Sequence, residues 1–370
     1  MKTRLRDQRS GESGFSLIEI MVGMVIGLLA IIVMMQVFAV SEERKRTANA
    51  GSDAQNSAVI ALDGMQRNIG QSGYGFALTR LLGCNLQLPF GAPVPLAPVI
   101  INPPVAVIPA GDANTDTLLV SYGLGNDQPE GYNLDNPGLT GPNHKIVGTG
   151  TGMLRIGDRV IAAPAACGAT TLVLGTVQTI GVPNPSDVTV TSSTTGTGLF
   201  NLGATPRFLA YAVRNGNLVV CDYMAANCGD ATAATLANPA IWRLVAENIA
   251  SLRAQYGQDT SGPPMDGTVD TYTQTTPVNA CQWARTPAIR LALVARSAQF
   301  EKENVTLAAP VWTGSTVSNV APTNPTAVPI GTPTNPDGTP DALWQRYRYR
   351  VFETVVPIRN VAWMGVVSGC

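Results

Sequence analysis

An acidic residue beside an apolar segment is the first feature of this sequence with a chemical consequence. Glu19 comes directly before Ile20–Val40, a run that contains no charged residue. A carboxylate at membrane depth costs about 2.5–3.5 kcal/mol on insertion scales, so such a group normally has a charged or polar partner. Glu19 therefore predicts pairing with a positively charged amine. A protonated or snorkelling carboxyl group at the membrane edge is the alternative.

A second group of acidic residues lies in a polar loop: Asp259, Asp266 and Asp270. Calcium prefers six to eight oxygen ligands, several of them carboxylates at a tight spacing such as D-x-D-x-D-G. Only Asp266 and Asp270 keep something of that pattern, and two consecutive prolines lengthen the loop. Calcium binding is one hypothesis for this loop, and an ordinary solvated turn is the favoured alternative.

Six cysteines follow the apolar run, and an even number in an exported chain predicts disulfides. Cys221 and Cys228 are the only two that are close in sequence. A chain reversal after Tyr223 would bring their Cα atoms to the roughly 5.5–6 Å that a disulfide needs, so we expect these two to pair. The spacing leaves the pairing of the other four open: Cys84, Cys167, Cys281 and Cys370.

Enzymatic chemistry has little support in this sequence. His144 is the only histidine, and we expect it in a solvated loop. No CxxC pair is present, which argues against a zinc site. The glycine-rich stretch 148–152 lacks the G-K-[ST] ending of a phosphate-binding loop. The sequence therefore argues against an enzyme, and a membrane-anchored periplasmic enzyme is kept as the alternative of another class.

Charge also argues against a general attraction to nucleic acid, because the formal net charge is −1. One stretch, 344–350, nevertheless alternates basic and aromatic residues. On a strand, Tyr347 and Tyr349 would share one face and the intervening arginines the other. DNA binding by stacking and cation contacts is one hypothesis. A half-buried strand whose arginines meet acidic residues or neighbouring subunits is the favoured one.

A long helix is expected to position Glu19, because residues 15–70 contain no proline. The first part, 20–40, has about the 20 apolar residues that a membrane-spanning helix needs. Beyond it, apolar residues recur at helical spacing, as on a helix with one buried face. These residues are Ala54, Ala58, Leu62, Met65 and Ile69. Glycines at 70, 73 and 75 are expected to end the helix.

The remainder, 71–370, has the pattern of a strand-rich domain. Alternating or β-branched runs are separated by loops, and Asn215-Gly216 between two such runs is a strong hairpin signal. Long Pro-rich loops are expected at 89–110 and 314–340. We therefore predict an α+β protein in which the long helix packs on a mainly antiparallel sheet domain.

The stretch Gly14-Phe15-Ser16-Leu17-Ile18-Glu19 resembles the processing site of type IV prepilins and pseudopilins. The resemblance implies that residues 1–14 are a leader removed after Gly14 by a prepilin peptidase, and that Phe15 is N-methylated. It also implies that Glu19 meets the Phe15 amine of a neighbouring subunit during assembly. A secretory signal peptide fits less well, because the apolar run is too long and no small-residue cleavage site follows it.

Three further stretches, 255–259, 289–297 and 348–360, resemble minor pilins of the PilW type. The resemblance implies a pilin-like fold and a role in priming type IV pilus assembly, at or near the tip, with twitching motility and adhesion as consequences. The implied partners are other minor pilins, the major pilin, the prepilin peptidase and a pilus-tip adhesin, with DNA as a further hypothesis. A type II secretion minor pseudopilin is the nearest alternative.

The same resemblance implies a location that changes during assembly. The protein would first lie in the inner membrane with its carboxyl-terminal domain in the periplasm, and later in the extracellular pilus. The basic leader before the apolar run is consistent with an amino terminus that stays in the cytoplasm.

Overall fold

The fold is described from a computed structural model, which divides by internal contacts into two units, Met1–Ala50 and Gly51–Cys370. The residues that the structure describes are 14–125, 130–135, 142–148, 152–166, 168, 171–191, 196–299, 301–312, 314, 326–327, 342–362, 364–367 and 369–370. Within helix α1, residues 43–44 and 46–55 are described by backbone only.

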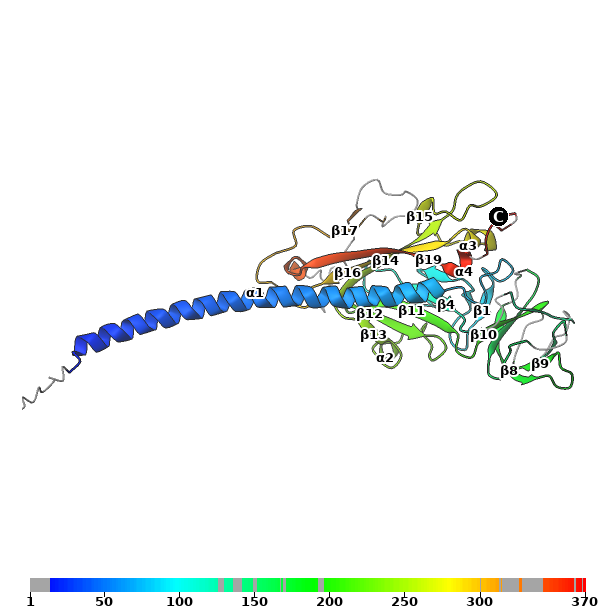
Figure 1. Ribbon diagram of the computed structural model, residues 1–370, viewed down its shortest axis with the longest axis horizontal. Coiled ribbons are helices and arrows are strands. Elements are labelled where there is room, and N and C mark those ends of the chain that lie inside the picture. The colour runs from blue at the N-terminus through cyan, green and yellow to red at the C-terminus, as the bar shows by residue number, and fades with distance from the viewer. Residues whose placement is uncertain are drawn as a thin grey trace, which may run out of the picture. The chain divides into compact units, whose positions relative to one another are not determined.

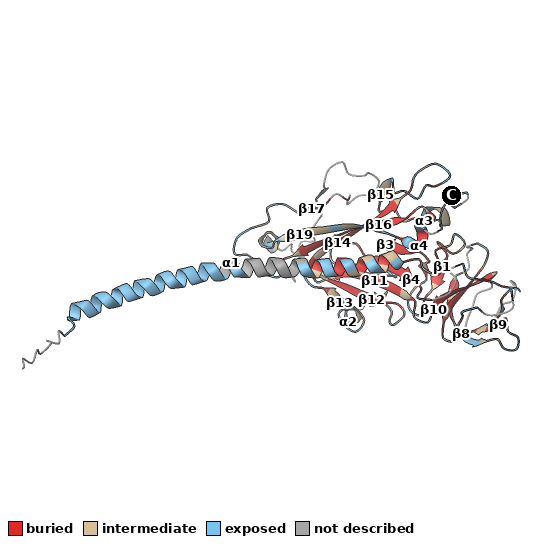
Figure 2. Ribbon diagram, viewed as in Figure 1, coloured by how far each residue is buried: buried red, intermediate tan, exposed pale blue. Residues whose placement is uncertain are grey.

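Helix α1 runs from Leu17 to Gln71 and is the long helix of Figure 1. Its amino-terminal part belongs to the first unit, where the apolar side chains from Leu17 to Val40 are exposed (Figure 2). An uninterrupted helix is expected there, because the segment contains no proline. No part of this apolar face is used for packing within the described unit.

The carboxyl-terminal part of α1 belongs to the second unit and is amphipathic. Its buried face joins the main hydrophobic core through Ala58, Ala61, Leu62, Met65 and Ile69. The helix ends before Gly73, whose φ of 82° suits glycine because a side chain is strained in this region. Asn360 caps this end, since its amide nitrogen donates to the carbonyl oxygens of Gln71 and Ser72.

A five-stranded antiparallel sheet forms one wall of the main core. Its order is β13 (Arg243–Ala246), β12 (Asn217–Asp222), β11 (Arg207–Arg214), β4 (Leu118–Tyr122) and β3 (Val99–Ile101). The β11–β12 hairpin turns at Asn215 and Gly216, which both have positive φ values, as a type I′ turn requires. The hairpin predicted from Asn-Gly is therefore confirmed.

A four-stranded antiparallel sheet packs against the first sheet through its strand β14, which contacts β11, β12 and β3. Its order is β15 (Thr271–Thr273), β14 (Ile249–Gln258), β16 (Ala288–Arg296) and β19 (Tyr349–Pro357). The short helices are α2 (Ala233–Leu236), α3 (Ala280–Ala284) and α4 (Arg359–Ala362), with a 3-10 turn at Ala342–Arg346. Two further strands, β17 (Val311–Trp312) and β18 (Thr326–Ala327), pair with each other.

An eight-stranded sheet is formed mainly by the segment between β4 and β11. Its strands are β1 (Asn85–Gln87), β2 (Val94–Pro95), β5 (Tyr132–Asn133), β6 (Asn143–Lys145), β7 (Arg159–Ala163), β8 (Leu172–Ile180), β9 (Asp187–Val190) and β10 (Gly198–Gly203). Alternate residues of β7 face different cores: Ile161 belongs to the main core, whereas Val160 and Ala162 belong to a second cluster. Strand β7 is therefore buried on both faces of the sheet.

Asn68 on α1 links the helix to the five-stranded sheet. Its amide nitrogen donates to the hydroxyl of Tyr211 at 2.7 Å, and its carbonyl oxygen accepts from the hydroxyl of Tyr122 at 2.9 Å. Burial raises the pKa of Tyr211 to about 12, although the bond from Asn68 opposes this shift. On the other sheet, Gln66 donates to Thr354 of β19. These polar contacts thus define the rotation of α1 about its axis more precisely than apolar packing alone would.

Asp116 is a buried carboxylate that ties the two main sheets together. Its oxygens accept hydrogen bonds from Asn102, Arg253, Gln274 and the backbone nitrogen of Ala254. The Arg253–Asp116 pair is almost fully enclosed, with side chains 9% and 4% exposed. Because a buried carboxylate is costly unless its oxygens are satisfied, these four donors are what make the position tolerable.

The α+β class expected from the sequence is confirmed, and one parallel pair, β1 with β8, interrupts the antiparallel pattern. The Pro-rich segment 89–110 holds two strands that the sequence did not predict, β2 and β3. Proline is tolerated in β2 because this strand lies at the edge of its sheet. Most of the loop expected at 314–340, and nearly all of the expected leader 1–14, lie outside the described residues.

We expect Asn68→Ala to lower the free energy of unfolding of the full chain in detergent by about 1–3 kcal/mol, because two tyrosine hydroxyls lose a partner. Denaturant unfolding followed by tryptophan fluorescence measures the change. Asp63→Ala is the control, since its ion pair with Arg67 is exposed and worth at most about 1 kcal/mol. Equal destabilisation by both variants would contradict the role given to Asn68.

Candidate functional site

The junction expected for processing lies at the start of α1. A Cβ added at Gly14 would meet no atom within 4 Å, and the side chain of Phe15 is 84% exposed. Helix begins at Leu17, so Gly14 and Phe15 precede the helix and are free of its hydrogen-bonded backbone. A peptidase can reach such a segment without first unwinding the helix.

Glu19 lies in the first turn of α1 and accepts a hydrogen bond from the backbone nitrogen of Ser16 at 3.2 Å. A Glu three residues after a helix-capping Ser is half of a capping box, in which the carboxylate satisfies a free N–H group. This role was missed from the sequence, although the Ser16-x-x-Glu19 spacing signals it. Glu19 therefore has a local structural role besides the intermolecular role that the sequence suggests.

The segment Leu17–Glu42 is long and apolar enough to cross a membrane, and none of its apolar window is buried. Exposure of a continuous apolar surface of this length to water is unfavourable, so lipid or other protein must cover it. The segment encloses the membrane-spanning run 20–40 that the sequence predicts. An apolar amino-terminal helix of this kind fits membrane anchoring.

Cys221 and Cys228 form a disulfide, as expected from the sequence, with Cα atoms 5.8 Å apart. Cys221 lies within the run of buried residues in β12, and both cysteines are fully buried. Between them Tyr223 is also buried, and its hydroxyl donates to the carbonyl oxygen of Val107. The disulfide thus anchors the turn after β12 to the core.

A second disulfide joins Cys281 of α3 to Cys370, with Cα atoms 5.2 Å apart. This pair is separated by 89 residues, so sequence spacing gave no reason to choose it. Cys84 is also disulfide-bonded, and Cys167 lies outside the described residues. The even cysteine count correctly predicted disulfides, but only the short-range pair could be assigned from the sequence.

The carboxylates of Asp259, Asp266 and Asp270 each accept separate hydrogen bonds within one loop. Asp266 accepts from the backbone nitrogen of Thr268, and Asp270 accepts from Thr260. Over the described ranges, no group of three or more His, Cys, Asp or Glu side chains is arranged to hold a metal ion. The loop has the local hydrogen bonds of an ordinary turn, and calcium binding stays a prediction.

Asp259 has a different role, as an acceptor that holds this loop closed. Its carboxylate accepts from the backbone nitrogens of Ser261 and Gly267 and pairs with Arg285 at 3.5 Å. Burial acts to raise the pKa of Asp259, but hydrogen bonds from the Ser261 hydroxyl and from backbone nitrogens outweigh burial and lower it. Arg285 also donates to the backbone oxygen of Cys370 at 2.7 Å. One guanidinium group thus joins the loop, helix α3 and the disulfide-bonded Cys370.

Two further sequence expectations have clear outcomes. His144 lies in strand β6 and is 4% exposed, so the expected solvated loop was wrong. Burial lowers its pKa, which keeps the ring neutral.

Strand β19 begins only at Tyr349, and Arg348 pairs with Glu301. Tyr349 packs on a small apolar cluster, as the favoured half-buried strand predicts.

We expect Asp259→Ala to lower the unfolding free energy of the full chain by about 3–5 kcal/mol, because Arg285 loses its carboxylate partner within a buried network. In the wild type a part of this stabilisation should be lost as the pH falls below the ordinary carboxyl pKa of 3.8, because the lowered pKa favours the ionised folded form. Denaturant unfolding between pH 7 and pH 3 measures both effects.

Asp266→Ala is the matched control, because this side chain is exposed and accepts one local bond. It should change stability by about 0.5 kcal/mol or less. If calcium raises the unfolding midpoint of the wild type but not of Asp266→Ala, the calcium hypothesis holds. An Asp259→Ala variant as stable as Asp266→Ala would contradict the anchoring role of Asp259.

Comparisons with known protein families match two separate parts of the chain. Residues 9–35 match the family described as the prokaryotic N-terminal methylation motif, and residues 211–360 match the family described as Type IV Pilus-assembly protein W. The second match runs from β11 to α4 and includes the four-stranded sheet. No curated protein and no solved structure matches the chain. The methylation motif lies on the apolar helix and the second match covers the four-stranded sheet, so the two family matches together support a pilin of the PilW type.

Proposed function

We propose that this protein is a minor pilin that helps to prime assembly of a type IV pilus, lies at or near the pilus tip, and supports twitching motility and adhesion. The observation that carries the proposal is the apolar span Leu17–Glu42, unburied in the described structure and preceded by a methylation motif. A PilW family match over 211–360 supports the same role. That match also suggests a structural rather than an enzymatic function.

The mechanism is a lateral transfer of α1 from the bilayer to a filament core. Lipid tails and a core of packed apolar helices are similarly apolar, so transfer of Leu17–Val40 changes the hydrophobic free energy little. Polar groups then decide the direction of transfer. Glu19 is costly in lipid, and an amine at Phe15 of a neighbouring subunit would relieve that cost.

The proposed partners follow from this route. A prepilin peptidase would act at Gly14, and the inner membrane would hold α1 before assembly, with the sheet domain in the periplasm. In the extracellular pilus, other minor pilins and the major pilin would surround the helix, and a tip adhesin would contact the sheet domain. A type II secretion pseudopilin shares the processing route, so the filament in which the protein is found distinguishes the two.

We expect the mature protein to begin at Phe15 and to carry an added methyl group on its amine. Intact-mass analysis and amino-terminal peptide sequencing of protein from sheared pili provide the measurement. A mature chain that begins after Val40 would contradict retention of the helix. Recovery of the protein only with a type II secretion apparatus would contradict the pilus assignment but not the processing.

We expect Glu19→Gln to reduce the ratio of pilus-associated to membrane-associated protein by about tenfold or more, as loss of a charge pair of about 1.5–3 kcal/mol implies. Gln can still accept the bond from Ser16, so it keeps the helix cap and removes only the charge. Quantitative immunoblots at equal expression measure the ratio.

Ser16→Ala is the complementary control, because it alters the residue before the helix and leaves the Glu19 charge in place. Its ratio should stay close to that of the wild type, and both variants should still be cut after Gly14. If Glu19→Gln assembles normally whereas Glu19→Ala does not, the carboxylate acts as a helix cap alone. The proposed charge match would then be wrong.

A further inference from the structure

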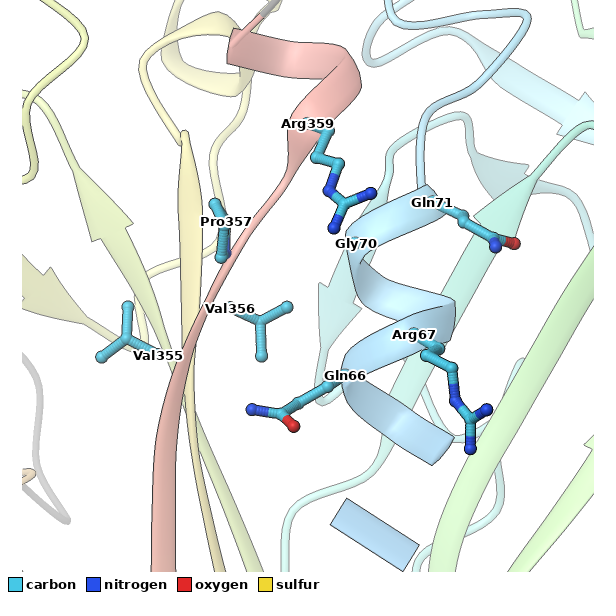
Figure 3. A pocket seen from close by; sticks show the side chains of 8 residues that line it. All are labelled: Gln66, Arg67, Gly70, Gln71, Val355, Val356, Pro357 and Arg359. Carbon is cyan, nitrogen blue, oxygen red and sulfur yellow. The ribbon is translucent and has the colours of Figure 1, made fainter. Parts of the chain in front are cut away.

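Two hollows meet at Arg359, near the carboxyl-terminal end of α1. The narrower one, of about 250 Å³, lies between the last turns of α1 and the end of β19 (Figure 3). The wider one, of about 770 Å³, lies between the turn that follows α1 and the segment around α4. Arg359 lines both, so we treat them as one feature, the Arg359 groove.

Arg359 is a cation without a partner in the part of the chain that the structure describes. Its side chain is exposed and makes no ion pair or hydrogen bond with the described residues. Capping of α1 does not require it, because Asn360 donates to the last carbonyl oxygens of the helix. Arg67, the other arginine of the narrow hollow, is paired with Asp63. The groove therefore presents one guanidinium group whose hydrogen-bonding capacity is unused.

The wider hollow next to Arg359 is mainly apolar. Ala77, Leu78, Met364 and Val367 line it, and its volume lies within the roughly 300–1,000 Å³ of ordinary ligand pockets. Gly75, which has a φ of 84°, forms part of the wall, where a Cβ would approach Leu202 to 3.0 Å. The backbone at Gly75 thus packs closely against Leu202 on this side of the hollow.

Glu130 adds a negative charge to the wider hollow and makes no ion pair with the described residues. A carboxylate entering the groove is therefore attracted to Arg359 and repelled near Glu130. Arg–carboxylate pairs are strong and directional, since the guanidinium group can donate two parallel hydrogen bonds. The groove thus favours a ligand with one carboxylate next to an apolar group over a ligand with several negative charges.

We propose that the Arg359 groove binds a peptide segment of a neighbouring pilus subunit in which an acidic side chain lies next to an apolar one. The acidic side chain binds Arg359, and the apolar side chain fills the wider hollow. This inference rests on the proposed function, because a filament places other subunits beside the groove at high local concentration. It adds a contact made by the sheet domain, separate from the contacts of the apolar helix.

The test uses the full chain in piliated cells, with the photo-reactive amino acid p-benzoylphenylalanine in place of Met364. We expect a light-dependent cross-link to another pilus subunit, and the cross-linked peptide, sequenced by mass spectrometry, should contain an Asp or Glu next to an apolar residue. Adding Arg359→Glu should reduce the cross-link by about tenfold or more, as loss of a charge-assisted bond implies. Arg155→Glu, a charge reversal at an exposed residue before β7, should leave it unchanged.

A charge exchange provides the positive control. Replacing the acidic residue of the cross-linked peptide by Lys should restore the cross-link to Arg359→Glu, which a purely structural role of Arg359 would not do. Arg359→Gln serves if Arg359→Glu does not accumulate. An unchanged cross-link in either variant, or a cross-linked peptide without an acidic residue, would overturn the inference. Absence of the wild-type protein from sheared pili would overturn the proposed function, and presence without any cross-link would overturn only the groove.

Discussion

Burial of one face of α1 is the interaction on which the second unit depends. Ala58, Leu62, Met65 and Ile69 recur at helical spacing and place the helix in the main core. Small alanines on that face allow close approach, and Asn68 sets the rotation through two tyrosine hydroxyls. Without this face, the two main sheets would each expose an apolar surface. The remaining apolar part of the same helix is left for lipid or other subunits.

Two buried carboxylates hold distant segments of the sheet domain together. Only 13% of the residues are charged, and two carboxylates, Asp116 and Asp259, accept several hydrogen bonds each. Each brings together segments that are distant in sequence: Asp116 joins β14 to the region before β4, and Asp259 joins its loop to Arg285. Buried carboxylates specify geometry because any other arrangement leaves their oxygens unsatisfied.

The sequence predicted most of what depends on local pattern. The helix was readable from missing prolines and apolar periodicity, β11 from the run before Asn-Gly, and the first disulfide from a short spacing. Contacts between distant segments were not readable, since nothing local links Cys281 to Cys370 or Arg285 to Asp259. His144 was misjudged for the same reason: a polar residue in a Gly- and Pro-rich stretch gives no sign that its segment will pair with β9.

The segment that forms most of the eight-stranded sheet lies between two strands, β4 and β11, that pair with each other. Tyr122, the last residue of β4, is paired with Arg207, the first residue of β11, so the segment between them begins and ends on adjacent strands. In topological terms this whole sheet, apart from β1 and β2, is an enlarged hairpin loop. Such a loop can gain or lose residues while β4 and β11 keep their register, because its two ends stay one strand spacing apart. The length of this segment can therefore vary at its turns, while residues such as Ile161 and Phe200 still pack in the main core.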